Sequence, residues 1–105
     1  MADDVTVVDA PDDHRFEVRV GGELAGVARY VRRAGRVVFT HTEIDPEFEG
    51  KGLGSQLARG ALDAVRAEGS RVVPLCPFMA GYIERHPDYQ ALVDAELLAR
   101  FEGPG

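Results

Sequence analysis

The chain is organised around one stretch, Thr42-Glu43-Ile44-Asp45-Pro46-Glu47-Phe48-Glu49-Gly50-Lys51-Gly52-Leu53-Gly54-Ser55-Gln56-Leu57. An apolar run ends just before it, and an amphipathic run begins inside it. The alternating glycines Gly50, Gly52 and Gly54 let the backbone approach a ligand closely. A helix that starts here offers unpaired N–H groups and the positive end of its dipole to an anion. The stretch therefore predicts a strand, a glycine loop and a helix start suited to a phosphate.

The helix predicted after the loop runs over residues 53–68. Its apolar residues recur at the spacing of one helical face, and Gly69 is a typical residue for its C-terminal end. Gly60 costs about 1 kcal/mol relative to alanine inside a helix, so we expect close packing there. A short strand follows over residues 71–76. Pro74 cannot donate to a ladder, so this strand is expected to be at an edge, bulged or diverging from its neighbour.

Upstream of the stretch the pattern is that of an antiparallel meander. Apolar and polar residues alternate through residues 15–20, which is the period of a half-buried strand. The pair Gly21-Gly22 is a two-residue hairpin signal. The continuous apolar run Val37-Val38-Phe39 indicates burial on both faces of its strand. The strands are predicted over residues 5–8, 15–20, 23–31 and 36–44, and the other turns over residues 9–13 and 32–35.

These elements predict an α+β fold with a mixed sheet. The strands at 36–44 and 71–76, with the helix between them, form a β-α-β unit whose parallel strands require a right-handed crossover. Two further helices are predicted over residues 78–85 and 89–101, followed by a frayed tail at 103–105. A length of 105 residues fits one domain, residues 1–105.

Composition limits the partners. The net charge is −6 with scattered arginines, which argues against nucleic acid and only weakly favours an amine substrate. No apolar run approaches the roughly 18 residues of a membrane span, and the acidic N-terminus does not resemble a signal peptide. Cys76 is the single cysteine, which suits a reducing compartment. We therefore expect a cytoplasmic protein with neither a nucleic-acid nor a membrane partner.

The glycine loop is not one of the common nucleotide motifs. No Lys-Ser or Lys-Thr pair follows the last glycine, and antiparallel strands precede the loop, so both a P-loop and a dinucleotide fingerprint are disfavoured. No Ser, Thr, Asp or Asn stands immediately before Leu53 as an N-cap. The first-turn amides are then open either to water or to a ligand, and Lys51 and Ser55 add a cation and a hydroxyl.

The hexapeptide Glu49-Gly50-Lys51-Gly52-Leu53-Gly54 resembles the acyl-CoA pyrophosphate loop of the GCN5-related N-acetyltransferases. That loop usually reads Arg or Gln, two variable residues, Gly, a variable residue, then Gly or Ala. Gly52 and Gly54 fill the two small-residue positions, whereas Glu49 stands at the first position, where the family usually has Arg or Gln. Residues 42–46 and 72–78, together with Tyr82, His86-Pro87 and Tyr89, look like a small uncharacterised branch of this superfamily, and the resemblance covers most of the second half of the chain.

The resemblance implies a compact acyl-CoA N-acyltransferase fold with acetyl-CoA as co-substrate, an amine acceptor that is a small molecule or a protein, and no metal. The loop amides with Lys51 and Ser55 would hold the pyrophosphate, and the pantetheine arm would lie along the strand ending at Ile44. Pro74 is a physical reason for the strands to open there. The implied cofactor-binding residues are Ile44, Gly50, Lys51, Gly52, Leu53, Gly54, Ser55, Pro77 and Phe78.

Cys76 and His41 are the first pair of candidate catalytic residues. A free cysteine is usually a small buried hydrophobe, and a functional thiol needs a histidine, a cation or a helix N-terminus beside it. His41 lies late in the neighbouring strand, so a Cys–His pair is possible if both side chains share a face. The small branch carries a cysteine and a histidine at what look like these positions, which implies a catalytic role.

Other assignments remain open. His41 could simply be the base that takes the amine proton, with Glu43 as the second candidate or a solvated carboxylate. Tyr82 and Tyr89 are candidates to protonate the CoA thiolate, a role that tyrosine often has in this superfamily, or they pack in the core. The histidines and the cysteine are too dispersed to show a metal-ligand spacing.

We therefore expect an N-acetyltransferase that transfers acetyl from acetyl-CoA to a primary amine. Two mechanisms are compatible with the residues: direct attack of the amine, or an acetyl-Cys76 intermediate. The rival hypothesis is a non-catalytic acyl-CoA binding or sensing module, since a small chain leaves little room for an acceptor pocket. The third hypothesis is an interaction domain that binds no small ligand.

Overall fold

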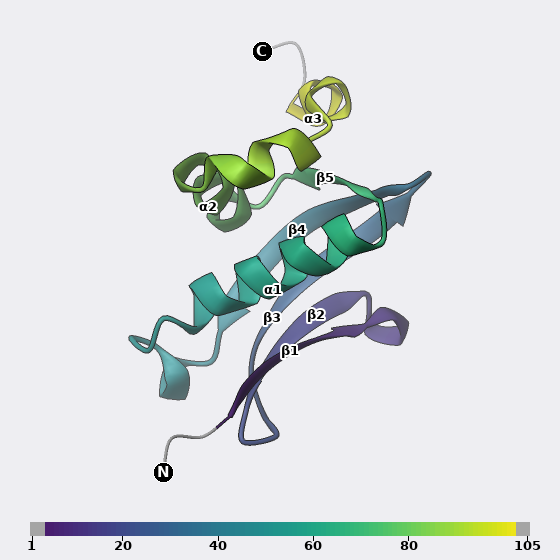
Figure 1. Ribbon diagram of the computed structural model, residues 1–105. Helices are drawn as coiled ribbons and strands as arrows, with labels where there is room; N and C mark the ends of the chain where they lie inside the picture. Colours follow the sequence, from purple (N-terminus) through teal and green to yellow (C-terminus); the bar gives the residue numbers. More distant parts are fainter. Residues whose placement is uncertain (1–3, 103–105) are drawn as a thin grey trace.

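A five-stranded mixed sheet with the order β1-β2-β3-β4-β5 forms the centre of the computed structural model, which describes residues 4–102 (Figure 1). Strands β1 to β4 pair antiparallel in chain order. The helix α1 connects β4 to β5, and these two strands pair in parallel. The predicted α+β fold, a meander followed by a β-α-β unit, is confirmed. The strands are β1 (Val5–Ala10), β2 (Arg15–Val20), β3 (Glu23–Arg33), β4 (Arg36–Ile44) and β5 (Arg71–Pro74).

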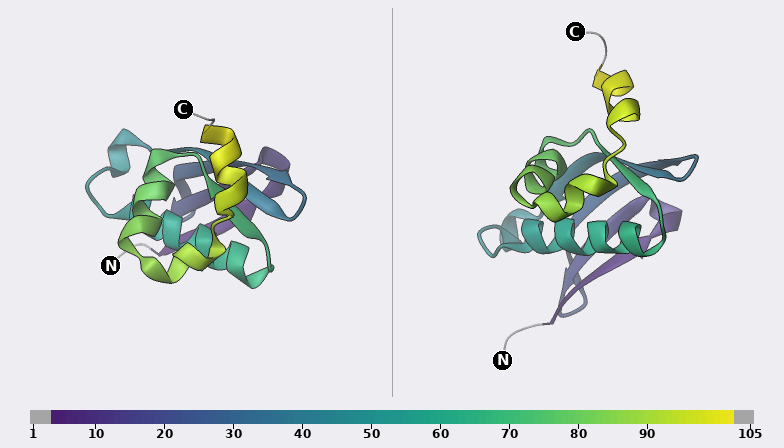
Figure 2. Two further views of the ribbon diagram at one scale, coloured as in Figure 1. Left: turned by 90° about the horizontal axis from the view of Figure 1, so that it is seen from above. Right: turned by 45° about the horizontal axis from the view of Figure 1, so that its top comes forward.

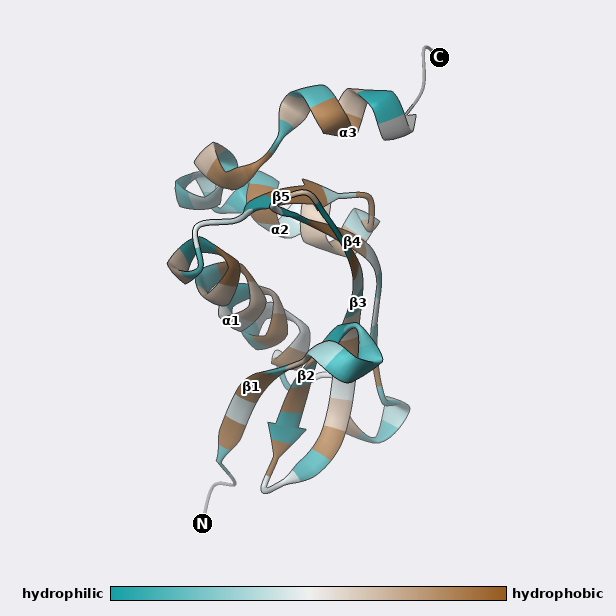
Figure 3. Ribbon diagram, turned by 90° about the vertical axis from the view of Figure 1, so that its right-hand side faces the viewer, coloured by the Kyte–Doolittle hydropathy of each residue, from teal (hydrophilic) through white to brown (hydrophobic). Residues whose placement is uncertain are grey.

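The helices gather mainly on one side of the sheet. Figure 3 shows α1 along one side of the strands, and both views of Figure 2 show α2 and η3 in green beside teal α1. The short helix α3 contacts β5. No helix within residues 4–102 is long and apolar enough to cross a membrane. The helical elements are η1 (Pro11–Asp13), η2 (Pro46–Phe48), α1 (Leu53–Ala67), α2 (Pro77–Arg85), η3 (Pro87–Leu92) and α3 (Ala95–Glu102).

The core lies between α1 and the sheet. The rings of Phe16, Tyr30 and Phe39 cluster on the face that α1 covers, with Phe16 and Tyr30 centroids 5.4 Å apart. Leu57 and Leu62 of α1 are fully buried against them, each stabilising the fold by about 1.5–3 kcal/mol. The helical apolar spacing read from the sequence is therefore the buried face of α1.

The close packing expected at Gly60 is present. A Cβ atom at Gly60 would lie 2.7 Å from the Cβ of Val7, which is inside van der Waals contact. Gly60 thus lets α1 approach β1. The end of α1 also follows the prediction, since Gly69 adopts φ +79° and its N–H donates to the Arg66 carbonyl at 3.0 Å.

Several predicted boundaries are wrong. β1 continues through Asp9, because Asp9 pairs with Phe16 and accepts a 2.5 Å hydrogen bond from the Tyr30 hydroxyl. β3 continues to Arg33, so the turn narrows to Ala34-Gly35, where both residues have positive φ. β5 ends at Pro74, and α2 already begins at Pro77.

The single helix predicted over residues 89–101 is also wrong. The chain forms η3, then becomes extended at Val93, which makes an isolated bridge to Val72, and only then enters α3. Asp94 starts α3, because its carboxylate accepts from the Leu97 N–H at 3.0 Å. Pairing with the sheet thus interrupts a helical pattern. Residues 1–3 and the predicted tail at 103–105 lie outside the described residues.

Candidate functional site

β4 and β5 separate beyond one shared carbonyl. The Phe39 carbonyl accepts hydrogen bonds from the N–H groups of Leu75 and Cys76, each at 3.0 Å, and from there to Ile44 β4 pairs with β3 but no longer with β5. Pro74 ends the parallel ladder, as the sequence predicted. The opening between these strands is therefore built into the backbone.

A β-bulge in β4 lies at the same level, and sequence reasoning missed it. Phe39 pairs with Tyr30 and His41 pairs with Arg29, so Thr40 is an extra residue without a partner in the ladder. A bulge bends its strand and changes which face the following side chains occupy. No residue in this segment signals the bulge, because it depends on the register with β3.

The helix N-terminus at the glycine loop has no side-chain cap. Gly52 occupies the N-cap position with φ +72°, and no side chain accepts from the first turn of α1. Gly50 also has positive φ, +80°. The capping carboxylate upstream, Asp45, serves η2 instead, accepting from the Glu47 N–H at 3.0 Å. The predicted absence of an N-cap is confirmed, and the first amides of α1 remain available to an anion.

A groove of about 510 Å³ joins this helix N-terminus to the opening beside β4. It contains most of the residues predicted to bind a cofactor, and Thr42 and Phe48 in addition. Lys51 and Pro77 do not line it. The lining residues are Thr42, Glu43, Ile44, Phe48, Glu49, Gly50, Gly52, Leu53, Gly54, Ser55 and Phe78.

Gly54 has a packing role besides its place in the loop. A Cβ atom there would lie 2.8 Å from Cζ of Phe78. The missing side chain therefore lets the first turn of α2 approach the first turn of α1. Phe78, 37% exposed, forms the groove wall at this contact.

The charges at the loop oppose one another. The Nζ atom of Lys51 lies 5.8 Å from the centroid of the Phe48 ring, at the rim of the groove. Glu49 lines the groove itself, so the residue that departs from the resemblance places a carboxylate near the anion seat. Backbone amides must then supply most of the attraction for a phosphate.

Cys76 is buried at the inner end of the groove. The residue is 4% exposed, its thiol donates to the Thr42 hydroxyl at 3.3 Å, and Thr42 is itself a lining residue. Cys76 is also the N-cap residue of α2, although its side chain makes no capping hydrogen bond. The thiol thus lies directly behind the groove wall.

His41 and Glu43 lie on the opposite face of the sheet from Cys76. Thr42 pairs with Ala28, which belongs to the core, whereas His41 pairs with Arg29. Alternation along β4 therefore directs His41 and Glu43 away from α1. Their Nε2 and Oε2 atoms are 3.3 Å apart, with side chains 58% and 63% exposed. The Cys76–His41 pair, which required both side chains on one face, is not formed: Cys76 donates to Thr42 and His41 contacts Glu43.

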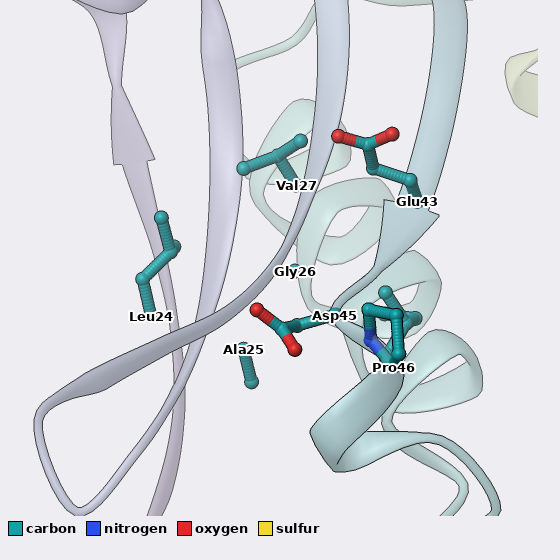
Figure 4. A pocket seen from close by; sticks show the side chains of 8 residues that line it. Leu24, Ala25, Gly26, Val27, Glu43, Asp45 and Pro46 are labelled. Atoms are coloured by element: carbon teal, nitrogen blue, oxygen red, sulfur yellow. The ribbon is translucent and has the colours of Figure 1, made fainter.

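A second depression, of about 370 Å³, adjoins the groove and shares Glu43 and Ile44 with it. Figure 4 shows the carboxylates of Glu43 and Asp45 on its rim, among apolar walls that include Leu24 and Val27. Its remaining lining residues are Ala25, Gly26 and Pro46. An acidic, partly apolar hollow thus opens next to His41 and Glu43.

The two candidate tyrosines lie elsewhere. The Tyr82 ring stacks on His86 with centroids 3.9 Å apart and lines a depression between α1, α2 and η3, not the groove. Tyr89 donates to Asp63 at 2.7 Å. Burial, and then this hydrogen bond, raise the pKa of Tyr89 to about 12, which makes it a poor acid near neutral pH. Tyr89 thus anchors η3 on α1.

Comparison with known proteins agrees with this geometry. The chain is similar to the NMR solution structure of a GCN5-like candidate N-acetyltransferase from Staphylococcus aureus, with a TM-score of 0.63 and 17% sequence identity. The match covers 84% of this chain and 86% of the Staphylococcus aureus chain, which shows a shared fold. No curated protein matches the sequence. The sequence profile of the GCN5-related N-acetyl-transferases matches residues 15–92, from β2 through η3, including the glycine loop and Cys76. The chain therefore belongs to the GCN5-related N-acetyltransferase family.

Proposed function

We propose that the protein transfers an acetyl group from acetyl-CoA to a primary amine. One observation carries this proposal: a single groove connects the uncapped N-terminus of α1 with the opening between β4 and β5. An anion site at one end suits the pyrophosphate, and the opening at the other end suits the thioester. The length of β4 between Thr42 and Ile44 lies along the path of the pantetheine arm.

The residues present fit CoA at the anion end. The amides of Gly52 and Leu53 at the start of α1 face no side-chain cap, and Ser55 adds a hydroxyl at the groove wall. Gly50 leaves open space where a side chain would otherwise stand. Lys51 at the rim supplies positive charge. These groups would hold the pyrophosphate through backbone donors and one lysine.

In the direct mechanism, His41 is the base. A carboxylate only accepts hydrogen bonds, so in the contact with Glu43 the His41 Nε2 carries the proton and Nδ1 keeps its lone pair. The ammonium group would first give one proton to Nδ1, which leaves the nitrogen with the lone pair needed for attack. The nitrogen would then bond to the acetyl carbon as the carbon–sulfur bond breaks, and its second proton would pass through water to the CoA thiolate. The acidic hollow of Figure 4 is the side from which a cationic amine would approach.

Cys76 supports a second route. Its thiol lies 3.3 Å from the lining residue Thr42, so the acetyl group could pass first to this sulfur, with release of CoA, and then to the amine. The two routes differ kinetically, because an acetyl-Cys76 intermediate gives ping-pong behaviour. Intact mass after incubation with acetyl-CoA separates them: an adduct of one acetyl group that is absent from Cys76→Ala supports the covalent route.

The proposed function is tested first by binding and then by turnover. Thermal shift with CoA and acetyl-CoA should show stabilisation, and no shift at millimolar ligand would contradict it. Release of free thiol is then followed across a panel of primary amines. His41→Gln should slow turnover by about 10²-fold or more, as expected for loss of a general base, while His14→Gln is the matched control. Binding without thiol release from any amine would favour the non-catalytic acyl-CoA module instead.

A further inference from the structure

A basic depression lies farther along the seam between α1 and α2, outside the groove. It has a volume of about 460 Å³ and brings three arginines together in a chain whose net charge is −6. Asp88 is the single acidic residue among those that line it. The lining residues are Arg59, Arg66, Tyr82, Arg85, His86, Pro87, Asp88 and Tyr89.

Two of these arginines have no partner among residues 4–102. Arg66 donates to the Asp88 carbonyl at 3.2 Å and lies over the Tyr89 ring, 4.8 Å from its centroid. Arg59 and Arg85, by contrast, make no hydrogen bond or ion pair within the described chain. Both are exposed and come from different helices, yet they face one depression. Asp88 also lines the depression, but neither Arg59 nor Arg85 forms an ion pair with it, so the two free guanidinium groups favour an anionic ligand.

His86 is held in a fixed orientation beside them. Its Nδ1 donates to the Tyr82 carbonyl at 2.8 Å, since a carbonyl can only accept, and its ring stacks on the Tyr82 ring at 19°. The Nε2 atom is therefore left for a ligand. This packing orients one more nitrogen at the depression without using Arg59 or Arg85.

The depression begins one helical turn beyond the groove. Ser55 lines the groove and Arg59 lines the depression, and on α2 the same step leads from Phe78 to Tyr82. Residues four apart on a helix have Cβ atoms about 5–6 Å apart. Both helices thus lead from the proposed pyrophosphate seat into the depression, and α1 places Arg59 one turn beyond it.

We propose that this depression binds the 3′-phosphate of CoA through Arg59 and Arg85, with His86 beside them. This inference rests on the proposed function. In CoA the 3′-phosphate and the diphosphate are carried by the same ribose, so their separation matches one helical turn plus the reach of an arginine side chain. Guanidinium groups bind phosphate oxygens bidentately, which makes them suited to a phosphate monoester. The two arginines would also offset the carboxylate of Glu49 in the groove.

The test compares CoA with 3′-dephospho-CoA by isothermal titration. The unaltered protein should bind CoA about tenfold or more tightly than dephospho-CoA. In the double variant Arg59→Gln/Arg85→Gln, that preference should fall to about twofold or less, while the affinity for dephospho-CoA stays unchanged. The control Arg100→Gln on α3 removes one positive charge outside both hollows, as each single arginine change in the depression does, and should retain the preference.

Each other outcome overturns the inference. If the unaltered protein binds both ligands equally, the 3′-phosphate has no site. If the double variant weakens both ligands by the same factor, the arginines act on the diphosphate or on the fold. Thermal unfolding of the variants without ligand separates these two cases. If the protein binds CoA and dephospho-CoA equally, the 3′-phosphate site is wrong but the proposed function still stands. If it binds neither ligand, both the 3′-phosphate site and the proposed function are wrong.

Discussion

The Cys76 thiol donates to the Thr42 hydroxyl at 3.3 Å across the gap where β4 and β5 separate. Because Thr42 lines the groove, a ligand that fills the groove to its inner end must cover the approach to Cys76. We therefore expect CoA at ten times its dissociation constant to slow alkylation of Cys76 about tenfold, by mass action. Intact mass against time measures the rate. Alkylation in urea is the control, and an unchanged native rate with bound CoA would place the thioester elsewhere.

Glu49→Gln should strengthen CoA binding. Glu49 lines the groove that holds the anion seat, and the amide removes a repulsive charge while keeping the shape of the side chain. An exposed charge of this kind is worth about 0.5–1 kcal/mol, which is a gain of about two- to fivefold in affinity. Titration at two salt concentrations measures it, since the gain should shrink as salt rises. Glu47→Gln on η2 is the matched control, and a weaker complex in Glu49→Gln would contradict the assignment.

Gly60→Ala should destabilise the protein although alanine is the better helix former. The helical gain of about 1 kcal/mol is opposed by overpacking against Val7, which costs about 1–3 kcal/mol. Urea unfolding gives the free energy of each variant. Adding Val7→Ala to Gly60→Ala should recover part of the lost free energy, because the methyl groups that clash are removed. Simple additivity of the two changes would show that α1 and β1 are not in close contact there.

Glu17→Gln should lower the free energy of unfolding at neutral pH and make that free energy depend less on pH in the acid range. Glu17 is 5% exposed and accepts from Arg15 and Arg19, whose hydrogen bonds, Arg15 first, hold its pKa below the ordinary 4.5. A carboxyl with a lowered folded pKa stabilises the fold above its unfolded pKa, and that stability is lost as pH falls through the folded pKa.

The amide in Glu17→Gln should therefore cost about 1.5–3 kcal/mol at pH 7, and the difference from the unaltered protein should narrow below about pH 4.5. Denaturant unfolding between pH 3 and pH 7 measures both effects. Glu23→Gln, an exposed carboxylate at the start of β3, is the control. Parallel pH profiles for Glu17→Gln and the unaltered protein would contradict the ion pairs as the cause.

Local patterns in the sequence determined most of the elements and the anion end of the groove. The glycines at 50–54, the uncapped Leu53, the hairpin at Gly21-Gly22 and the stop at Pro74 all act through backbone conformation or missing hydrogen-bond groups. Such effects belong to the residue itself and its immediate neighbours. They are therefore readable without knowledge of what packs against them.

Only the tertiary structure decided which face His41 occupies. Without the extra residue Thr40, alternation from buried Phe39 would have put His41 on the same side as Cys76. The bulge is a shift in the register of β4 against β3, and that register is set by pairing between two strands and not by the residues around Thr40. Contact with Val72 likewise breaks the helical pattern at Val93. Pairing between distant strands, which no local pattern encodes, thus separated the cysteine from the histidine.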